Sequence, residues 1–221
     1  MAMKTALTVM LSAVGVLAGC SAAVPGTATW PGAALEAAVL QITDFPPGVQ
    51  YDRINEQPGT PDGAVAPGSM LSRPQGCANA LTNVIANSAE RGPGSAAKYA
   101  VSYDGARMVM TLLSWNLDLD TLRAAAVRCA KFEAFFDPDS AGIPITTTEL
   151  SGLEPAALAY QQTMRLNDAS TSVFMAFQNV GERAVFGVAF PTPNSAIEAK
   201  ATLPQTFLDV FGRQVEKLRS Y

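Results

Sequence analysis

The sequence has no histidine among its 221 residues, and this absence excludes common classes of catalyst. Ser-His-Asp triads and Cys-His pairs both use an imidazole as the general base. Without imidazole, a metal site would depend mainly on carboxylates and amides. The sequence therefore argues against these nucleophilic enzymes, and we expect neither a cofactor nor a catalytic residue of that kind.

Charged side chains are also scarce, at 15% of the residues, with 15 basic and 19 acidic groups. Proteins that bind nucleic acid or anionic lipid surfaces do so with clusters of Lys and Arg. A sparse and net acidic charge argues against both kinds of partner. We therefore expect no nucleic acid among the partners of this chain.

The first half of the sequence has one long apolar run, Ala6 to Ala18, and it is shorter than the roughly 20 residues that span a bilayer. A basic start, Met1 to Thr5, precedes this run, and Leu17-Ala18-Gly19-Cys20 closes it. These are the parts of an export signal, and the cysteine at its end is typical of a bacterial lipoprotein. We expect residues 1–19 to be removed and a diacylglyceryl group to anchor Cys20 on the extracytoplasmic side of the cell membrane.

The chain after Cys20 divides into a spacer and a domain. Residues 20–32 are rich in Pro, Gly, Ala, Ser and Thr, which predicts a flexible spacer between the lipid and the folded part. Residues 33–221 are enough for a substantial apolar core, so we expect a single globular domain. The Pro- and Gly-rich stretch 55–76 is long for a connection; a functional segment and a plain exposed connection both fit it.

Two cysteines, Cys77 and Cys129, remain once Cys20 carries the lipid. An even pair in an exported chain predicts a disulfide. A catalytic thiol would need a basic partner such as histidine, and two cysteines cannot complete a zinc site. We therefore expect a structural bridge between Cys77 and Cys129.

Apolar residues spaced by three and four predict three or four helices. These helices cover residues 33–42, 77–88, a stretch from Leu119 to Phe136 that includes Cys129 and Phe132, and a last helix that starts near Thr202 and ends at Arg219. Asp118 and Asp120 suit the start of the third helix, because acidic groups are favoured there. Leu35, Val39 and Ile42 form the apolar stripe of the first helix.

Runs rich in β-branched and aromatic residues predict strands over 49–54, 98–103, 107–115, 143–150, 157–166, 171–180 and 183–190. Asp104-Gly105 predicts the turn of a hairpin, because glycine there admits a positive φ. Short connections imply antiparallel neighbours. The expected fold class is α+β, with an antiparallel sheet of six or seven strands and three or four helices packed mainly on one face.

Two weak patterns would support a histidine-free hydrolase or transferase, which is the alternative function. Ser95-Ala96-Ala97-Lys98 matches the S-x-x-K of serine acyl-transferases, but it leads into a strand and lacks the partner motifs of that class. A carboxylate pair for glycoside cleavage could come from four acidic residues, although the sequence does not fix their separation: Glu149, Glu154, Asp168 and Glu182. Asn116, Asp118 and Asp120, and the pair Asp137 and Asp139, could ligate calcium, but helix capping and turn formation explain them better.

The strands of the second half carry two kinds of face. One is apolar, with residues such as Tyr160, Met175 and Phe186. The other mixes polar and aromatic residues, and together with Trp115 it gives the candidate ligand-binding residues Trp115, Gln161, Thr163, Arg165, Phe174 and Gln178. Aromatic rings, amides and one guanidinium suit a binding groove, and they equally suit a solvated sheet face.

Several short segments resemble those of a known family. They are the export signal ending at Cys20, Asp44-Phe45-Pro46-Pro47-Gly48, Cys77 at the start of a helix, Cys129-Ala130-Lys131-Phe132, and Leu203-Pro204-Gln205-Thr206-Phe207. With these segments the chain resembles mycobacterial cell-envelope lipoproteins of unknown function. It is more distantly similar to the extracellular sensor domain of PknH-type receptor kinases. The resemblance implies a sheet with helices around a cleft, and it carries over no catalytic residue.

Together these observations predict a membrane-anchored extracytoplasmic lipoprotein that binds and does not catalyse. The expected partners are the membrane, through the lipid, and a small or lipidic ligand or an envelope protein.

Overall fold

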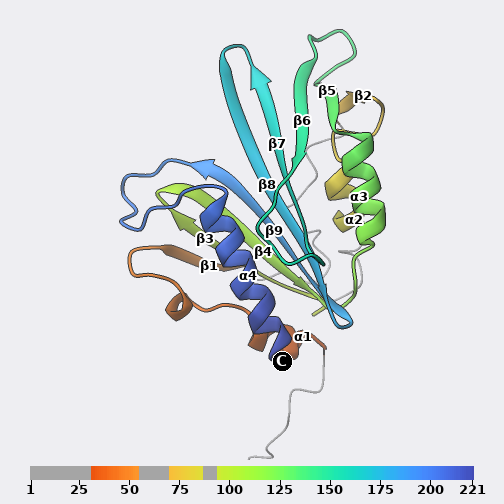
Figure 1. Cartoon of the computed structure of the whole chain (residues 1–221). Coiled ribbons are helices and arrows are strands. Elements are labelled where there is room, and N and C mark those ends of the chain that lie inside the picture. Colours follow the sequence, from red (N-terminus) through yellow and green to blue (C-terminus); the bar gives the residue numbers. More distant parts are fainter. Residues whose placement is uncertain (1–30, 55–69, 87–93) are drawn as a thin grey trace, which may run out of the picture.

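The computed structural model describes residues 31–54, 70–86 and 94–221 (Figure 1). Its α-helices are α1 (Pro31–Ala38), α2 (Ala80–Ala86), α3 (Leu119–Arg128) and α4 (Gln205–Arg219), and η1 (Ile42–Asp44) is a 3-10 helix. One antiparallel sheet holds nine strands in the order β1-β3-β4-β9-β8-β7-β6-β5-β2. The strands are β1 (Gln50–Ile54), β2 (Leu71–Arg73), β3 (Ala96–Tyr103), β4 (Gly105–Leu113), β5 (Lys131–Phe135), β6 (Ile143–Glu149), β7 (Leu158–Leu166), β8 (Ala169–Val180) and β9 (Arg183–Thr192).

The α+β class and the antiparallel sheet are confirmed, but the expectation of six or seven strands is wrong. The seven predicted strands are all present, and the hairpin turn falls at Asp104 and Gly105, where Gly105 has φ +103°. The two additional strands are β2 and β5, which pair with each other at one end of the sheet. β2 is only three residues long and lies in the stretch expected to be a loop.

β5 replaces the second half of the predicted long helix. α3 ends at Arg128, and Cys129 caps it. In β5 the side chains alternate, with Phe132 and Ala134 buried and Lys131 and Glu133 exposed. This period of two, together with pairing to β6, overrides the helical spacing that also runs through these residues. Phe136, expected on the helical stripe, is 75% exposed.

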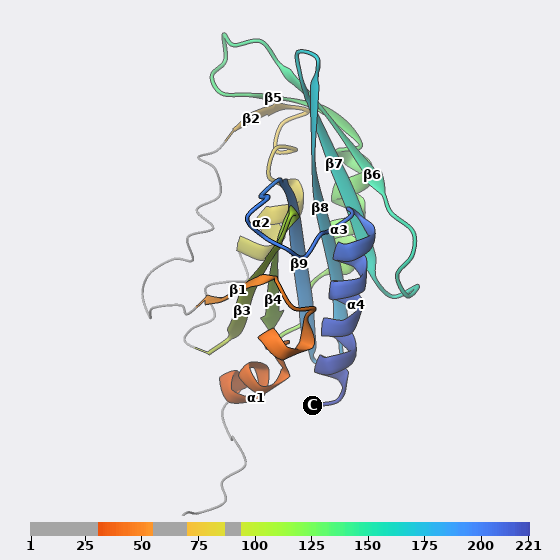
Figure 2. The same ribbon diagram turned by 90° about the vertical axis from the view of Figure 1, so that its left-hand side faces the viewer.

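Helices cover both faces of the sheet, so the expectation that they pack mainly on one face is wrong. α1 packs on β3, and α4 packs on β8 and β9; we call this side the α4 face. α2 and α3 pack together on the opposite side, the α3 face, where α3 meets β6 and β7. Figure 2 shows α4 on the near side of the strands and α3 on the far side. The reason is that neighbouring residues of β8, such as Met175 and Ala176, are both buried, one on each face.

The core beneath α4 is packed closely around a glycine. Phe207 and Phe211 of α4 are fully buried against Met108 and Met110 of β4. Gly187 of β9 lies between them, and a Cβ atom there would come within 2.8 Å of the Met110 sulfur. The absence of a side chain at this position allows α4 to approach the sheet.

The first and last helices are fastened to each other by a buried amide. Gln214 of α4 is 0% exposed; its Nε2 donates to the Ala38 carbonyl at 2.8 Å, and its Oε1 accepts from the Leu40 amide at 3.0 Å. Lys217 adds an ion pair of 2.8 Å with Asp44 in η1. Ile42, expected on the buried stripe of the first helix, is instead 50% exposed, because the α-helix has already ended at Ala38.

The predicted export signal over residues 1–19, Cys20 and residues 21–30 of the predicted spacer lie outside the described residues. α1 begins at Pro31, so the last two residues of that spacer belong to a helix. Among the described residues, no helix has the length and apolarity needed to cross a membrane.

Candidate functional site

The structure separates the six predicted binding residues onto the two faces of the sheet. Trp115 is 7% exposed and packs in the core of the α3 face with Leu81 and Leu122. The other five are on β7 and β8 and point to the α4 face. The expected juxtaposition of Trp115 with Gln161, Thr163 and Arg165 is therefore wrong. The cause is that Trp115 comes two residues after Leu113, so its side chain is on the same side as that of Leu113, which points away from α4.

Phe174 and Gln178 are on the correct face for that site but are buried. Phe174 is 5% exposed within the core under α1 and α4. Gln178 is 3% exposed, and its Nε2 donates to Glu154 Oε2 at 3.0 Å. Both side chains already have protein neighbours in place of a ligand.

Gln161, Thr163 and Arg165 lie on the outer part of β7, outside the core under α1 and α4. Gln161 Nε2 donates to Ser172 Oγ at 2.8 Å and to Thr163 Oγ1 at 3.2 Å, and the two hydroxyls are 3.0 Å apart. Gln161 and Thr163 are half-buried, and Arg165 is exposed. These three predicted residues remain accessible, and Ser172 of β8 joins them.

The same surface continues across β6 and β5, and we call it the open sheet surface. The polar residues that point outward there are Lys131, Glu133, Thr146, Thr148, Gln161, Thr163, Arg165, Ser170 and Ser172. Phe135 and Pro144 point outward as well, at the end of the surface where Glu133 lies. The strand register aligns Lys131, Thr146, Thr163 and Ser172 in one row across four strands. α4 packs on β8 and β9, at the side of this surface. Lys131, Thr146 and Ser172 were not among the predicted binding residues, although their alternation with apolar neighbours signals a strand face.

A recess of about 260 Å³ lies between α4 and the loop before β7. Glu154 and Glu216 line it, and both bind Arg219 of α4. The hydrogen bond from Arg219, followed by that from Gln178, holds the pKa of Glu154 below its usual range. A carboxylate that is kept ionised in this way cannot serve as a general acid near neutral pH.

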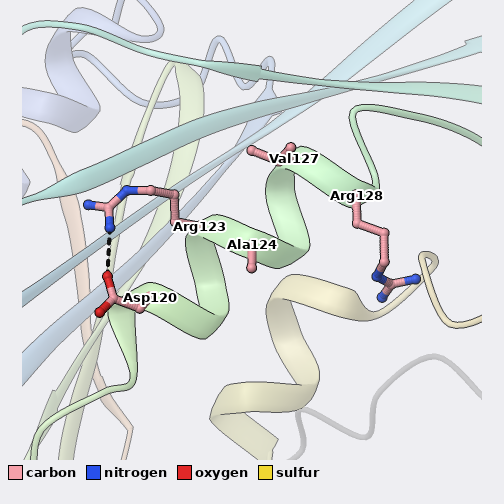
Figure 3. Close-up of a pocket in the computed structure, with 5 residues that line it drawn as sticks. All are labelled: Asp120, Arg123, Ala124, Val127 and Arg128. Atoms are coloured by element: carbon pink, nitrogen blue, oxygen red, sulfur yellow. Dashed lines mark hydrogen bonds and ion pairs between the residues drawn. The ribbon is translucent and has the colours of Figure 1, made fainter.

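A hollow of about 440 Å³ is on the outer surface of α3 (Figure 3). Its lining residues are Asp120, Arg123, Ala124, Val127 and Arg128, all from that one helix. Figure 3 shows Arg123 turned toward Asp120, to which it binds at 2.8 Å, with Arg128 pointing away at the other end. These five residues do not supply an opposing wall, so the hollow is a shallow surface and not an enclosed ligand site.

The Ser95 and Lys98 pattern does not form a catalytic pair. Ser95 directly precedes β3 and Lys98 is within that strand. Residues three apart face each other on a helix but point to opposite sides of an extended strand. Ser95 is also 8% exposed, which leaves it poorly placed to attack a substrate.

The candidate acidic residues are distributed around the molecule. Asp168 and Glu182 lie in the turns at the two ends of β8, which spans roughly 40 Å at about 3.4 Å per residue. Glu149 ends β6, and Glu154 binds Arg219. The separation of Asp168 and Glu182 does not fit the pair of carboxylates that cleaves a glycosidic bond.

The proposed calcium ligands have structural roles. Asp118 caps α3, where its Oδ1 accepts from the Thr121 amide at 2.9 Å, and Asp137 accepts from the Asp139 amide at 3.0 Å. The expectation of a helix cap and a turn is confirmed. In the described part of the chain, three or more potential metal-ligating side chains do not gather anywhere.

Cys77 and Cys129 form a disulfide, as predicted, with their Cα atoms 5.4 Å apart. The bridge joins the segment just before α2 to the residue that caps α3. Both cysteines are fully buried beside Phe132 and Ala134 of β5. The bridge therefore fixes the α2–α3 pair to the end strands of the sheet.

Comparison with solved structures identifies the fold. The chain is similar to the extracellular domain of PknH from Mycobacterium tuberculosis, with a TM-score of 0.51 and 13% identity over 86% of this chain and 97% of that one. It also matches the uncharacterised Rv0999 ortholog from Mycobacterium smegmatis, with a TM-score of 0.48 and 13% identity over 86% and 95% of the two chains. The expected distant similarity to a PknH-type sensor domain is thus confirmed as a shared fold.

No protein-family model matches the chain, and no curated protein sequence does.

Proposed function

We propose that this protein is a lipoprotein, anchored through Cys20 on the extracytoplasmic side of the cell membrane, whose domain works as a non-enzymatic binding or sensor-like module. The export signal supports the anchor. The buried disulfide supports an oxidising compartment, because such bridges are rare in the cytosol. The PknH domain that shares the fold is an extracellular domain, which agrees with this location.

A binding role is favoured over the alternative, a hydrolase or transferase without histidine. Ser95 and Lys98 lie on an extended segment that separates their side chains. Glu154, the acidic residue of the α4 recess, is held ionised by Arg219. Neither the Ser95–Lys98 pair nor Glu154 therefore has the arrangement that the proposed catalysis would need.

The observation that carries the binding role is the open sheet surface. Its two exposed cations, Lys131 and Arg165, form neither a hydrogen bond nor an ion pair with any described residue. Unpaired charges beside half-buried hydroxyls are the polar groups that a ligand site uses to orient its ligand. We propose that this surface binds the ligand or envelope partner of the module.

A photocrosslinking experiment in the host cell tests this assignment. A photoreactive amino acid replaces Thr146, at the centre of the open sheet surface, or Arg107, which is exposed on β4 and points to the opposite face. We expect specific adducts from position 146 and only background from position 107. Equal labelling from the two positions, or none from either, would refute a binding role for this surface.

The anchor has its own test. Replacing Cys20 by Ala removes the thiol that carries the lipid, so the protein should leave the membrane fraction. If the Cys20→Ala variant remained as firmly membrane-bound as the natural chain, the lipoprotein assignment would be wrong.

A further inference from the structure

The two cations of the open sheet surface, which bind no described residue, are placed to act together. Lys131 of β5 and Arg165 of β7 are separated by one strand and offset by two residues along the sheet. Strand spacing of about 4.8 Å and a rise of about 3.4 Å per residue put their Cα atoms about 12 Å apart. Long flexible side chains at that separation can hold one anionic group between them or two successive groups of an extended ligand.

Glu133 is the one acidic side chain among the outward residues of this surface, and it is directed toward Gly142. Its carboxyl carbon lies 3.1 Å from where a Cβ atom on Gly142 would be. Gly142 lies at the end of the β5–β6 loop, beyond the row that contains Lys131 and Thr146. The centre of the surface therefore carries a local excess of positive charge, on a chain whose net charge is −4.

Hydroxyl groups fill the space between the two cations. Thr146 and Thr163 are paired across β6 and β7, and Ser172 continues the row onto β8. Thr146 and Thr148 are exposed, and their hydroxyls form no hydrogen bond with the described part of the chain. A hydroxyl both donates and accepts, so this row complements a ligand that is itself rich in hydroxyls.

The charge and hydroxyl pattern distinguishes between classes of ligand. A lipid surface is recognised by larger basic clusters with apolar residues beside them. This surface has two cations that bind no described residue, and its apolar residues Phe135 and Pro144 lie level with or beyond Glu133, away from the row of hydroxyls. A neutral glycan would depend on stacking against an aromatic ring, but Phe174 is buried and the ring of Phe135 has the Arg73 guanidinium over it, 5.4 Å from its centroid. A glycan that carries acidic groups uses both the cations and the hydroxyls.

We infer that the open sheet surface binds an anionic glycan chain across β5–β8, with Lys131 and Arg165 contacting its carboxylate or phosphate groups and the Thr146–Ser172 row contacting its hydroxyls. This inference rests on the proposed binding function and names its ligand class. Both cations are solvent-exposed, so the affinity should fall as salt rises.

The test measures binding of the mature acylated protein, in detergent, to polygalacturonate and to phosphorylated dextran. Neutral dextran, polyglutamate and vesicles containing phosphatidylglycerol are the comparison ligands. We expect at least one of the two anionic glycans to bind more tightly than every comparison ligand. Equal binding of polyglutamate would reduce the site to plain charge attraction, and tighter binding of the vesicles would indicate a lipid surface; either result overturns the inference.

Matched variants locate the site. The double variant Lys131→Gln and Arg165→Gln should weaken glycan binding about tenfold, which corresponds to about 1.4 kcal/mol. Arg107→Gln removes an exposed arginine from the opposite face and should leave the affinity within about twofold. An unchanged affinity in the double variant, or an equal loss in Arg107→Gln, would overturn the inference. If position 146 crosslinks in cells while neither anionic glycan binds, the ligand class is wrong and the binding function stands.

Discussion

Replacing Gln214 by Leu tests whether one buried amide fastens the first helix to the last. Leu is close to Gln in size, so the substitution removes hydrogen-bonding groups without opening a large cavity. It leaves the Leu40 amide and the Ala38 carbonyl without their partner, in residues that are 4% and 0% exposed. Each of these two unsatisfied buried groups costs about 1–3 kcal/mol, so the free energy of unfolding should fall by about 2–6 kcal/mol.

Urea unfolding followed by circular dichroism measures this loss, and amide hydrogen exchange locates it. The Leu40 amide should lose protection in Gln214→Leu, because it donates to the removed oxygen. The control is Gln205→Leu at the exposed first residue of α4, which should change stability by less than about 0.5 kcal/mol. A loss below about 1 kcal/mol, or a Leu40 amide that stays protected, would refute the reasoning.

Three further predictions concern the disulfide, an ion pair and a glycine. Replacing Cys77 and Cys129 by Ala opens a 52-residue loop and should lower stability by about 2–5 kcal/mol in urea unfolding while the protein, if still folded, keeps its ligand binding; an unchanged midpoint would contradict this. The hydrogen bond from Lys217, and then that from the Gln41 amide, lowers the pKa of Asp44, so its contribution to stability is present above the unfolded value near 3.8 and is lost as pH falls through the lower folded value. The stability difference between the natural chain and Asp44→Asn should therefore shrink between pH 6 and pH 2, and a constant difference would count against the ion pair. Gly187→Ala should destabilise by about 1–3 kcal/mol because its Cβ would meet Met110 and Phe207, whereas Gly212→Ala, which has open space on α4, should be neutral or stabilising; similar thermal shifts for the two would show that α4 is not closely packed at Gly187.

The sequence was sufficient to predict a structural feature where one local signal determines that feature. Asp104-Gly105 between two β-rich runs predicted a hairpin that is present, because the turn chemistry is carried by those two residues. The bridge between Cys77 and Cys129 followed from an even cysteine pair behind a predicted export signal. In both cases the predicted feature did not depend on which elements pack where.

The sequence was insufficient where two patterns overlapped or where packing decided. Cys129, Phe132 and Phe136 continue a helical spacing, while Lys131 and Glu133 alternate with buried neighbours, and pairing with β6 selects the strand. The prediction of the binding residues was partly wrong for a related reason. Gln161, Thr163 and Arg165 are accessible as predicted, but the position of α4 over β8 and β9, which no local pattern encodes, buries Phe174 and Gln178.

The contact between α1 and α4 also determines where the chain can be labelled. Both views show α1 and the C-terminal end together at one end of the molecule, with the turn between β7 and β8 at the other (Figures 1 and 2). Tyr221, the last residue, is 60% exposed. A fluorescent reporter fused after Tyr221 would therefore sit beside the helix through which the chain enters the fold. It would leave the outer ends of β6–β8 unobstructed, so a C-terminal fusion suits tests of the proposed ligand binding and of the proposed location.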